Sequence, residues 1–216
     1  MDPLRFAIAA VPLAAYLVLL GLINLRRRPT VVSGASDVAT LGLALTGLVM
    51  IGPISLFWPE HASESLGDFV WLFLLAFYWL WVVLIVMLGR PRLVIYNLTA
   101  EELRPVLSEA SRRIDPSGRW AGDNLSLPSV GVQAHLDCLA WMRNTSLVSS
   151  GGRQDLAGWR RLGRTVERSL RDTETPPSSR GASLLGVGVG LLVMSVARLV
   201  SDPPAVLAAW QQIIAG

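Results

Sequence analysis

The stretch FVWLFLLAFYWLWVVLIVML, residues 69–88, decides the architecture of this chain. Its twenty residues carry no charge. A helix of this length is about 30 Å long, which matches the hydrocarbon core of a bilayer. A helix in the core of a soluble protein keeps a polar face, and this stretch has none. It therefore predicts a transmembrane helix, and a polar region begins directly after it at Arg90-Pro91-Arg92.

Two uncharged apolar runs precede this helix, at about 6–25 and 38–58. Arg26-Arg27-Arg28 follows the first run where a signal peptide would have its small-residue cleavage site, so we interpret the run as an uncleaved helix. Residues 26–37 are expected to form a short polar link that ends in the N-cap Ser36-Asp37. In the second run, Gly42 and Gly47 favour close helix contacts, and Gly52-Pro53 predicts a bend.

A fourth apolar run spans about 182–200, and a short helix is expected at about 203–214. The last helix is too short to cross a bilayer, so we expect it to lie in the membrane interface or to dock on the helix bundle. Ala182, Gly186 and Gly190 recur every four residues along the fourth run and form a helix-packing groove in which another backbone can approach closely.

The composition agrees with a membrane protein. Of the 216 residues, 52% are hydrophobic and 16% are charged, whereas soluble proteins carry roughly 25% charged residues. The net charge is only +3 and all basic residues are arginines, several of which flank apolar runs and orient them. We therefore expect no nucleic-acid partner. The single cysteine, Cys138, excludes an intramolecular disulfide and a cysteine-based metal cluster.

The distribution of arginines predicts the topology. Six arginines flank one side of the membrane, and only Arg5 and Arg198 flank the other. Because the positive side is cytoplasmic, both termini are expected outside and the polar region in the cytoplasm. We expect a multi-pass protein of the cell (inner) membrane. The six arginines are Arg26, Arg27, Arg28, Arg90, Arg92 and Arg180.

The expected fold is an all-α membrane bundle of four transmembrane helices with a small cytoplasmic α+β domain inserted between the third and fourth helices. The three parts are 1–90, the soluble domain 91–178, and 179–216. Within the domain the pattern predicts the order β-α-β-β-β-α, and Thr99 with Glu102 forms a capping box at the first helix. The predicted strands are 93–96, 119–127, 130–136 and 145–150, and the predicted helices begin after Thr99 and near Asp155.

His135, Asp137 and Cys138 resemble parts of a catalytic site. In a strand, His135 and Asp137 share a face and Cys138 points to the other, so the histidine does not activate the thiol. We expect an exposed strand face with a small buried thiol, and neither a catalytic residue, a metal site nor a cofactor.

The most basic segment is the last helix of the soluble domain. Its arginines lie on one face, where they either meet solvent or contact anionic lipid headgroups. The glycine-rich turn that ends in Arg153 is a further candidate for anion contact. The candidate anion-contact residues are Arg153, Arg160, Arg164, Arg168 and Arg171.

The sequence leaves three functional classes open. The leading one is a non-enzymatic scaffold, accessory or assembly subunit that packs against another membrane protein or a second copy of itself. The alternatives are a membrane-associated enzyme acting on a lipid or anionic substrate, and a homo-oligomeric channel. Coupled transport has no support, because no ionisable residue lies in the middle of an apolar run.

Overall fold

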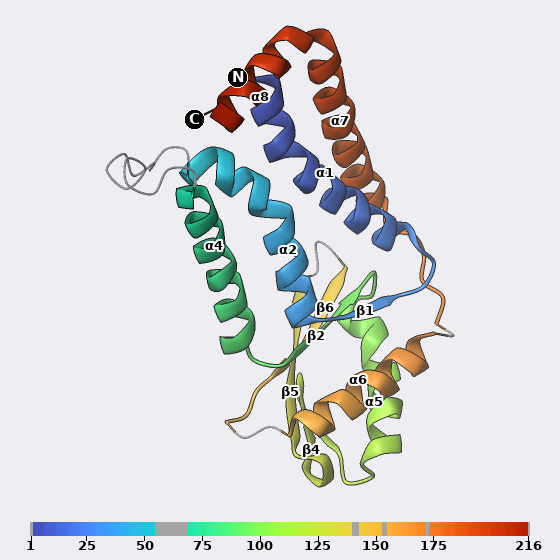
Figure 1. Ribbon diagram of the computed structural model, residues 1–216. Helices are drawn as coiled ribbons and strands as arrows, with labels where there is room; N and C mark the ends of the chain where they lie inside the picture. Colours follow the sequence, from blue (N-terminus) through green and yellow to red (C-terminus); the bar gives the residue numbers. More distant parts are fainter. Residues whose placement is uncertain (1, 55–68, 140–142, 153–154, 172, 216) are drawn as a thin grey trace. The chain divides into compact units, whose positions relative to one another are not determined.

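The computed structural model describes residues 2–54, 69–139, 143–152, 155–171 and 173–215 (Figure 1). The chain forms two compact units. An apolar unit comprises Met1–Leu20, Val38–Met87 and Ser183–Gly216, and a polar unit comprises Gly21–Asp37 and Leu88–Ala182. The elements in chain order are α1 (Pro3–Leu25), β1 (Thr30–Ser33), α2 (Gly34–Val49), a π-helical segment (Met50–Ile54), α4 (Phe69–Leu88), β2 (Arg92–Tyr96), α5 (Ala100–Ile114), β3 (Arg119–Ala121), β4 (Asn124–Leu127), a 3-10 turn (Pro128–Val130), β5 (Val132–Leu139), β6 (Asn144–Ser149), α6 (Leu156–Leu170), α7 (Ser179–Ser201) and α8 (Pro203–Ala215).

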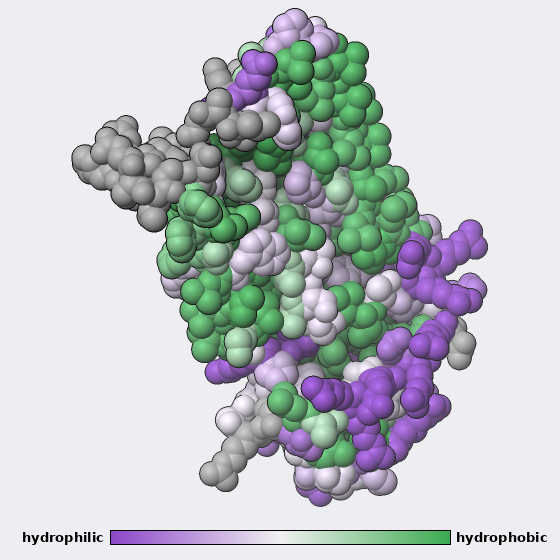
Figure 2. Space-filling view, viewed as in Figure 1, coloured by the Kyte–Doolittle hydropathy of each residue, from purple (hydrophilic) through white to green (hydrophobic). Residues whose placement is uncertain are grey.

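Four helices in the described chain are long and apolar enough to cross a membrane, as predicted. They are α1, α2 with its continuation to Gly52, α4 and α7. In α4 only Val70 and Val82 are buried, and Figure 2 shows hydrophobic surface over α4 and α7. So large an exposed apolar surface requires lipid or an apolar partner. The chain is therefore compatible with a membrane protein.

Glycines allow close contacts between helices of the apolar unit. A Cβ at Gly47 would lie 1.9 Å from the carbonyl oxygen of Ile8, and one at Gly42 would lie 2.9 Å from Val82. The Tyr78 hydroxyl also donates a 2.6 Å hydrogen bond to the Gly42 carbonyl. The predicted small-residue contacts of the second apolar run are thus confirmed. The predicted bend at Gly52-Pro53 falls in the π-helical segment, and residues 55–68, including Trp58, lie outside the described chain.

The polar unit contains a six-stranded antiparallel sheet in the order β1-β2-β6-β5-β4-β3. Strand β1 corrects the prediction that residues 26–37 are only a link, because Val32 pairs opposite Val94 of β2. Its β-branched side chains suit a strand, but four residues give little periodicity to detect. The polar unit thus draws on two stretches of chain, and not only on the stretch between the third and fourth long helices.

The start of α2 also differs from the prediction. The helix begins at Gly34, before the expected cap Ser36-Asp37. Its cap is Ser33, whose hydroxyl accepts a 3.1 Å hydrogen bond from the Ser36 amide. Asp37 instead lies in the first turn, forms a 3.0 Å ion pair with Arg92, and accepts a hydrogen bond from the Tyr96 hydroxyl. These contacts connect the start of α2 to β2.

Two strand boundaries in the polar unit were predicted wrongly. The expected strand 119–127 is the hairpin β3–β4, which turns at Gly122 with φ +60°. The next strand begins at Val132 and not at 130, because a 3-10 turn and the left-handed Gly131 precede it. From β2 onward the order is therefore β2-α5-β3-β4-β5-β6-α6, which contains one strand more than expected.

Helices α5 and α6 lie side by side on one face of the sheet (Figure 1). The capping box at the start of α5 is confirmed, with Thr99 and Glu102 each accepting a hydrogen bond from the other's amide. The helix continues through Pro105, which is exposed. One hydrophobic core lies between the helices and the sheet, and its buried members include Leu103, Leu107, Ala110, Ile114, Leu125, Leu127, Val132, Leu136, Leu147, Trp159, Leu162, Val166 and Leu170.

Asn97 joins three segments of the polar unit. It is fully buried and has a left-handed backbone with φ 62°. Its side-chain amide donates to the Arg26 carbonyl at 2.8 Å and to the Thr175 hydroxyl at 3.1 Å. The Thr175 amide in turn donates to the Arg27 carbonyl at 2.8 Å. The loop after β2 is therefore tied to the segments that follow α1 and α6.

Candidate anion-binding groove

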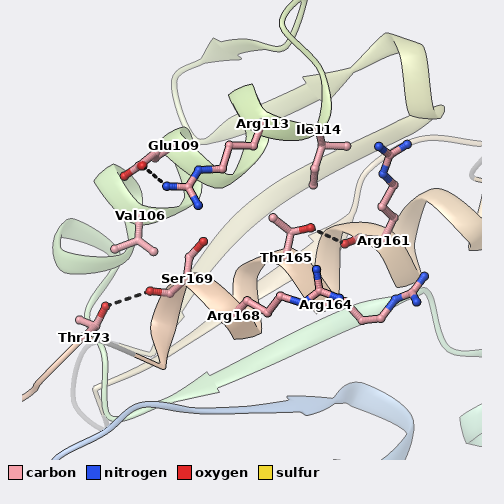
Figure 3. A pocket seen from close by; sticks show the side chains of 10 residues that line it. All are labelled: Val106, Glu109, Arg113, Ile114, Arg161, Arg164, Thr165, Arg168, Ser169 and Thr173. Carbon is pink, nitrogen blue, oxygen red and sulfur yellow. Dashed lines mark hydrogen bonds and ion pairs between the residues drawn. The ribbon is translucent and has the colours of Figure 1, made fainter.

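The outer surfaces of α5 and α6 form a groove in the polar unit. The apolar stripe of each helix faces the sheet, so the polar residues that flank the stripes meet along the seam between the helices. The groove has a volume of about 720 Å³, which is within the range of small-molecule sites. Its lining residues are Val106, Glu109, Arg113, Ile114, Arg161, Arg164, Thr165, Arg168, Ser169 and Thr173 (Figure 3).

The lining is strongly basic. The described lining residues include four arginines and one carboxylate, which give them a formal charge of +3. Arg113 is paired with that carboxylate, Glu109, one helical turn before it. Among the described residues, Arg161, Arg164 and Arg168 have no ion-pair partner, although the Arg164 Nε donates to the Arg160 carbonyl at 3.3 Å. Figure 2 shows hydrophilic surface gathered over α6. The groove therefore holds three guanidinium groups without a counter-charge in the described chain.

Hydroxyl groups lie among the arginines. The Thr165 hydroxyl donates to the Arg161 carbonyl at 3.0 Å, and the Thr173 hydroxyl donates to the Ser169 carbonyl at 3.4 Å (Figure 3). The Ser169 hydroxyl makes no hydrogen bond to a described residue. Guanidinium groups bind oxyanions through two parallel N–H donors, and a free hydroxyl adds another donor. The lining suits a phosphate-type oxyanion.

The groove has few of the groups that catalysis requires. Among the described residues, its lining contains no histidine, cysteine or aspartate, and the one described carboxylate is held by an arginine. A serine or threonine hydroxyl becomes a nucleophile only beside a general base. No group of three or more potential metal-ligating side chains occurs among the described residues. The described lining can bind and orient an anion.

Only some of the predicted anion-contact residues line the groove. Arg164 and Arg168 line the groove, whereas Arg160 is exposed outside it. Arg171 forms a 3.1 Å ion pair with Glu167, and Arg153 lies outside the described residues.

Sequence reasoning missed two arginines of the groove. Arg161 was not among the candidate residues, although it stands three residues before Arg164 and seven before Arg168. This spacing places all three arginines on one flank of a helix. Arg113 belongs to the other helix, so only the contact between the helices reveals its role.

The described part of the glycine-rich turn before α6, which ends at Gly152, contributes no residue to the described lining of the groove. Asp155 caps the helix, and its carboxylate accepts a 2.9 Å hydrogen bond from the Ala157 amide. A side chain of the protein thus supplies negative charge at this helix terminus, where an anion would otherwise bind.

His135, Asp137 and Cys138 do not form a site together. His135 is exposed, and its Nδ1 lies 3.1 Å from the Asn124 side-chain oxygen on the neighbouring strand. The prediction of a buried thiol was wrong, because Cys138 is exposed near the end of β5. The Thr145 hydroxyl is its hydrogen-bond partner, at 3.9 Å from the sulfur.

No family model, curated protein or solved structure matches this chain.

Proposed function

We propose that this chain is a non-enzymatic accessory or scaffold protein of the membrane whose polar unit binds a phosphate-bearing anion between α5 and α6. The observation that carries the proposal is the set of three arginines without a described counter-charge, which lines a groove large enough for a small molecule. Surface arginines often form ion pairs along their own helix, as Arg171 does with Glu167. A groove lined by arginine side chains without a counter-charge can bind an oxyanion, which then supplies the negative charge.

The membrane part of the proposal has separate support. Four helices have the length and composition of membrane spans, and the six arginines beside them favour a cytoplasmic polar unit. We propose that the protein is multi-pass in the cell (inner) membrane, with both termini outside. The short helix α8 then lies in the interface, where the exposed side chains of Leu207 and Trp210 meet the headgroup region.

The accessory role is supported by the outward face of α7. A Cβ at Gly186 or Gly190 would meet no atom within 4 Å, and Ala182 is exposed. Small residues that face outward in a membrane helix permit close approach of another helix. The proposed partner is another membrane protein or a second copy of this chain.

Phosphate binding tests the proposal. The full chain in detergent is unfolded thermally in sodium phosphate and in sodium chloride of equal ionic strength. A ligand at a hundredfold excess over its Kd stabilises the folded state by about 2.7 kcal/mol, so phosphate should raise the Tm of the wild type. Arg168→Gln should lose most of that increase. Arg160→Gln is the matched control, because it removes an exposed arginine of the same helix that does not line the groove.

Two results would contradict the proposal. One is equal stabilisation of both variants, which would reduce the effect to general screening of positive charge. The other is absence of any phosphate effect on the wild type. Turnover of a phosphate ester that is lost in Arg168→Gln would favour the alternative of a membrane-associated enzyme.

A further inference from the structure

The basic groups of the groove are spread along its length. Arg161, Arg164 and Arg168 occupy positions i, i+3 and i+7 of α6, so their backbone positions extend over about 10 Å at 1.5 Å per residue. In Figure 3 their guanidinium groups do not converge on one point, and Arg113 lies toward the opposite end from Arg161. A single phosphate ion therefore contacts only part of this set.

The lining between the charges is of two other kinds. Val106 and Ile114 contribute apolar side chains from α5. Thr165 and Ser169 contribute hydroxyl oxygens from α6, and the Ser169 hydroxyl makes no hydrogen bond to a described residue. Such a lining suits a short carbon chain that carries hydroxyl groups, because its C–H groups contact the apolar side chains and its hydroxyls contact the serine and threonine.

We infer that the ligand of the groove carries two phosphoryl groups joined by a short polyol. One phosphoryl group is bound at the Arg161–Arg164 end and the other near Arg168. This chemistry occurs in soluble sugar bisphosphates and in the headgroup of cardiolipin, in which a glycerol links two phosphates. The inference rests on the proposed function, because it names the ligand class of the same groove.

Matched ligands test the number of phosphoryl groups. The full chain in phosphatidylcholine nanodiscs is titrated with fructose 1,6-bisphosphate and with fructose 6-phosphate at equal ionic strength. Because the second phosphoryl group adds a second charge-assisted contact, the bisphosphate should bind at least about tenfold more tightly. Arg161→Gln should remove that advantage and leave the weaker monophosphate binding. Arg160→Gln should preserve the advantage.

Lipid probes distinguish the two sources. Nanodiscs that contain cardiolipin are compared with nanodiscs that contain twice the molar amount of phosphatidylglycerol, which equalises the phosphate. Greater thermal stabilisation by cardiolipin, lost in Arg161→Gln, supports the inference with a lipid as the ligand. Tight bisphosphate binding without a cardiolipin effect supports it with a soluble ligand. The Tm of each variant without ligand confirms that the substitution does not unfold the chain.

Different results would overturn the two-phosphoryl ligand and the anion-binding groove. Equal affinity for bisphosphate and monophosphate, with both lost in Arg168→Gln, would overturn the two-phosphoryl ligand and leave an anion-binding groove. Absence of binding by every phosphate-bearing probe would overturn both.

Discussion

Glu109 is an internal competitor for the anion that the groove is proposed to bind. Its carboxylate is paired with Arg113 and is the only negative charge among the described lining residues. Glu109→Gln should therefore increase the affinity for phosphate, by roughly twofold to fivefold if the pair is worth up to about 1 kcal/mol. Isothermal titration with phosphate measures the change.

A second ion pair provides the control for this prediction. Glu167 pairs with Arg171 at the same i,i+4 spacing, but neither residue lines the groove. Glu167→Gln should leave phosphate affinity unchanged. An equal gain in both variants would indicate a general effect of net charge, and a loss of affinity in Glu109→Gln would contradict the assigned role.

Asp115 predicts an acid-sensitive contribution to stability. This side chain is 1% exposed and accepts hydrogen bonds from the Ser117 hydroxyl at 2.5 Å and from the Ser117 and Ser129 amides at 2.9 Å. The Ser117 hydroxyl is the largest cause, and together these bonds lower the pKa of the carboxyl from 3.8 to about 2. Because the folded state binds the proton less readily, the contribution is present above pH 4 and is lost between about pH 4 and 2.

The measurement is denaturant unfolding of the full chain across this pH range. The free energy of unfolding of the wild type should fall as the pH decreases from about 4 to 2. Asp115→Asn should be less stable than the wild type near neutral pH, and its stability should fall less in that window. A parallel decline in the two proteins would mean that other carboxylates control the acid transition.

Side-chain interactions were predictable from the sequence where the partners lie within a few residues of each other. Thr99 and Glu102 are three residues apart, and their capping box was predicted from that spacing. In the sequence, Asn97 is notable only as the start of an N-glycosylation motif, Asn97-Leu98-Thr99. Its hydrogen-bond partners Arg26 and Thr175 are 71 and 78 residues away along the chain. Its role in joining three segments required the fold.

At the scale of elements, α7 has two distinct faces of small residues. Gly181, Gly188 and Ser195 are buried and recur every seven residues. A Cβ at Gly188 would lie 2.9 Å from both the Ala14 carbonyl oxygen and the Val18 amide nitrogen of α1. The predicted stripe of Ala182, Gly186 and Gly190 faces outward instead. The pattern of four was visible in the sequence, but the face that contacts α1 was not.

Substitutions on the two faces should therefore differ. Gly188→Leu should destabilise the chain by about 1–3 kcal/mol or more, because the added side chain overlaps the backbone of α1. Gly186→Leu should leave the Tm in detergent unchanged and should reduce co-purification of a partner or a second copy. The Tm values of the two variants show which face packs against α1. Equal destabilisation by both substitutions would contradict the difference between the two faces.

In the polar unit, long helices were predicted more accurately than short strands. Helices α5 and α6 each have fifteen residues with a clear buried stripe, and both begin next to the residues from which they were predicted to start. The four-residue strand β1 follows an arginine run and was overlooked. The hairpin β3–β4 was read as one strand because its turn, Gly122-Asp123, has only two residues.

At the scale of the whole molecule, the arginine distribution predicts the membrane topology. A reporter fused after Thr173 should be cytoplasmic, and a reporter inserted near Ser63 should be outside, because the arginine-rich side stays in the cytoplasm. Paired alkaline phosphatase and fluorescent-protein fusions measure this. Glycosylation at Asn124 during expression in a eukaryotic host would place the polar unit on the opposite side.

The groove is a property of the folded molecule that the sequence alone did not predict. Its basic residues come from α5 and from α6, and Arg113 and Arg161 are far apart in the sequence. The arginine-rich face of α6 was recognised as a candidate for anion contact. Which of its arginines are paired, and which share a groove with α5, depends on the packing of the two helices against the sheet.

The most direct test of the groove is to locate a bound oxyanion. Crystals of the full chain are soaked in tungstate, a tetrahedral analogue of phosphate, and its position is found from anomalous scattering. We expect tungsten in the groove, with tungstate oxygens at hydrogen-bond distance from the guanidinium groups of Arg164 or Arg168. Ordered tungstate elsewhere on the polar unit, with none in the groove, would contradict it.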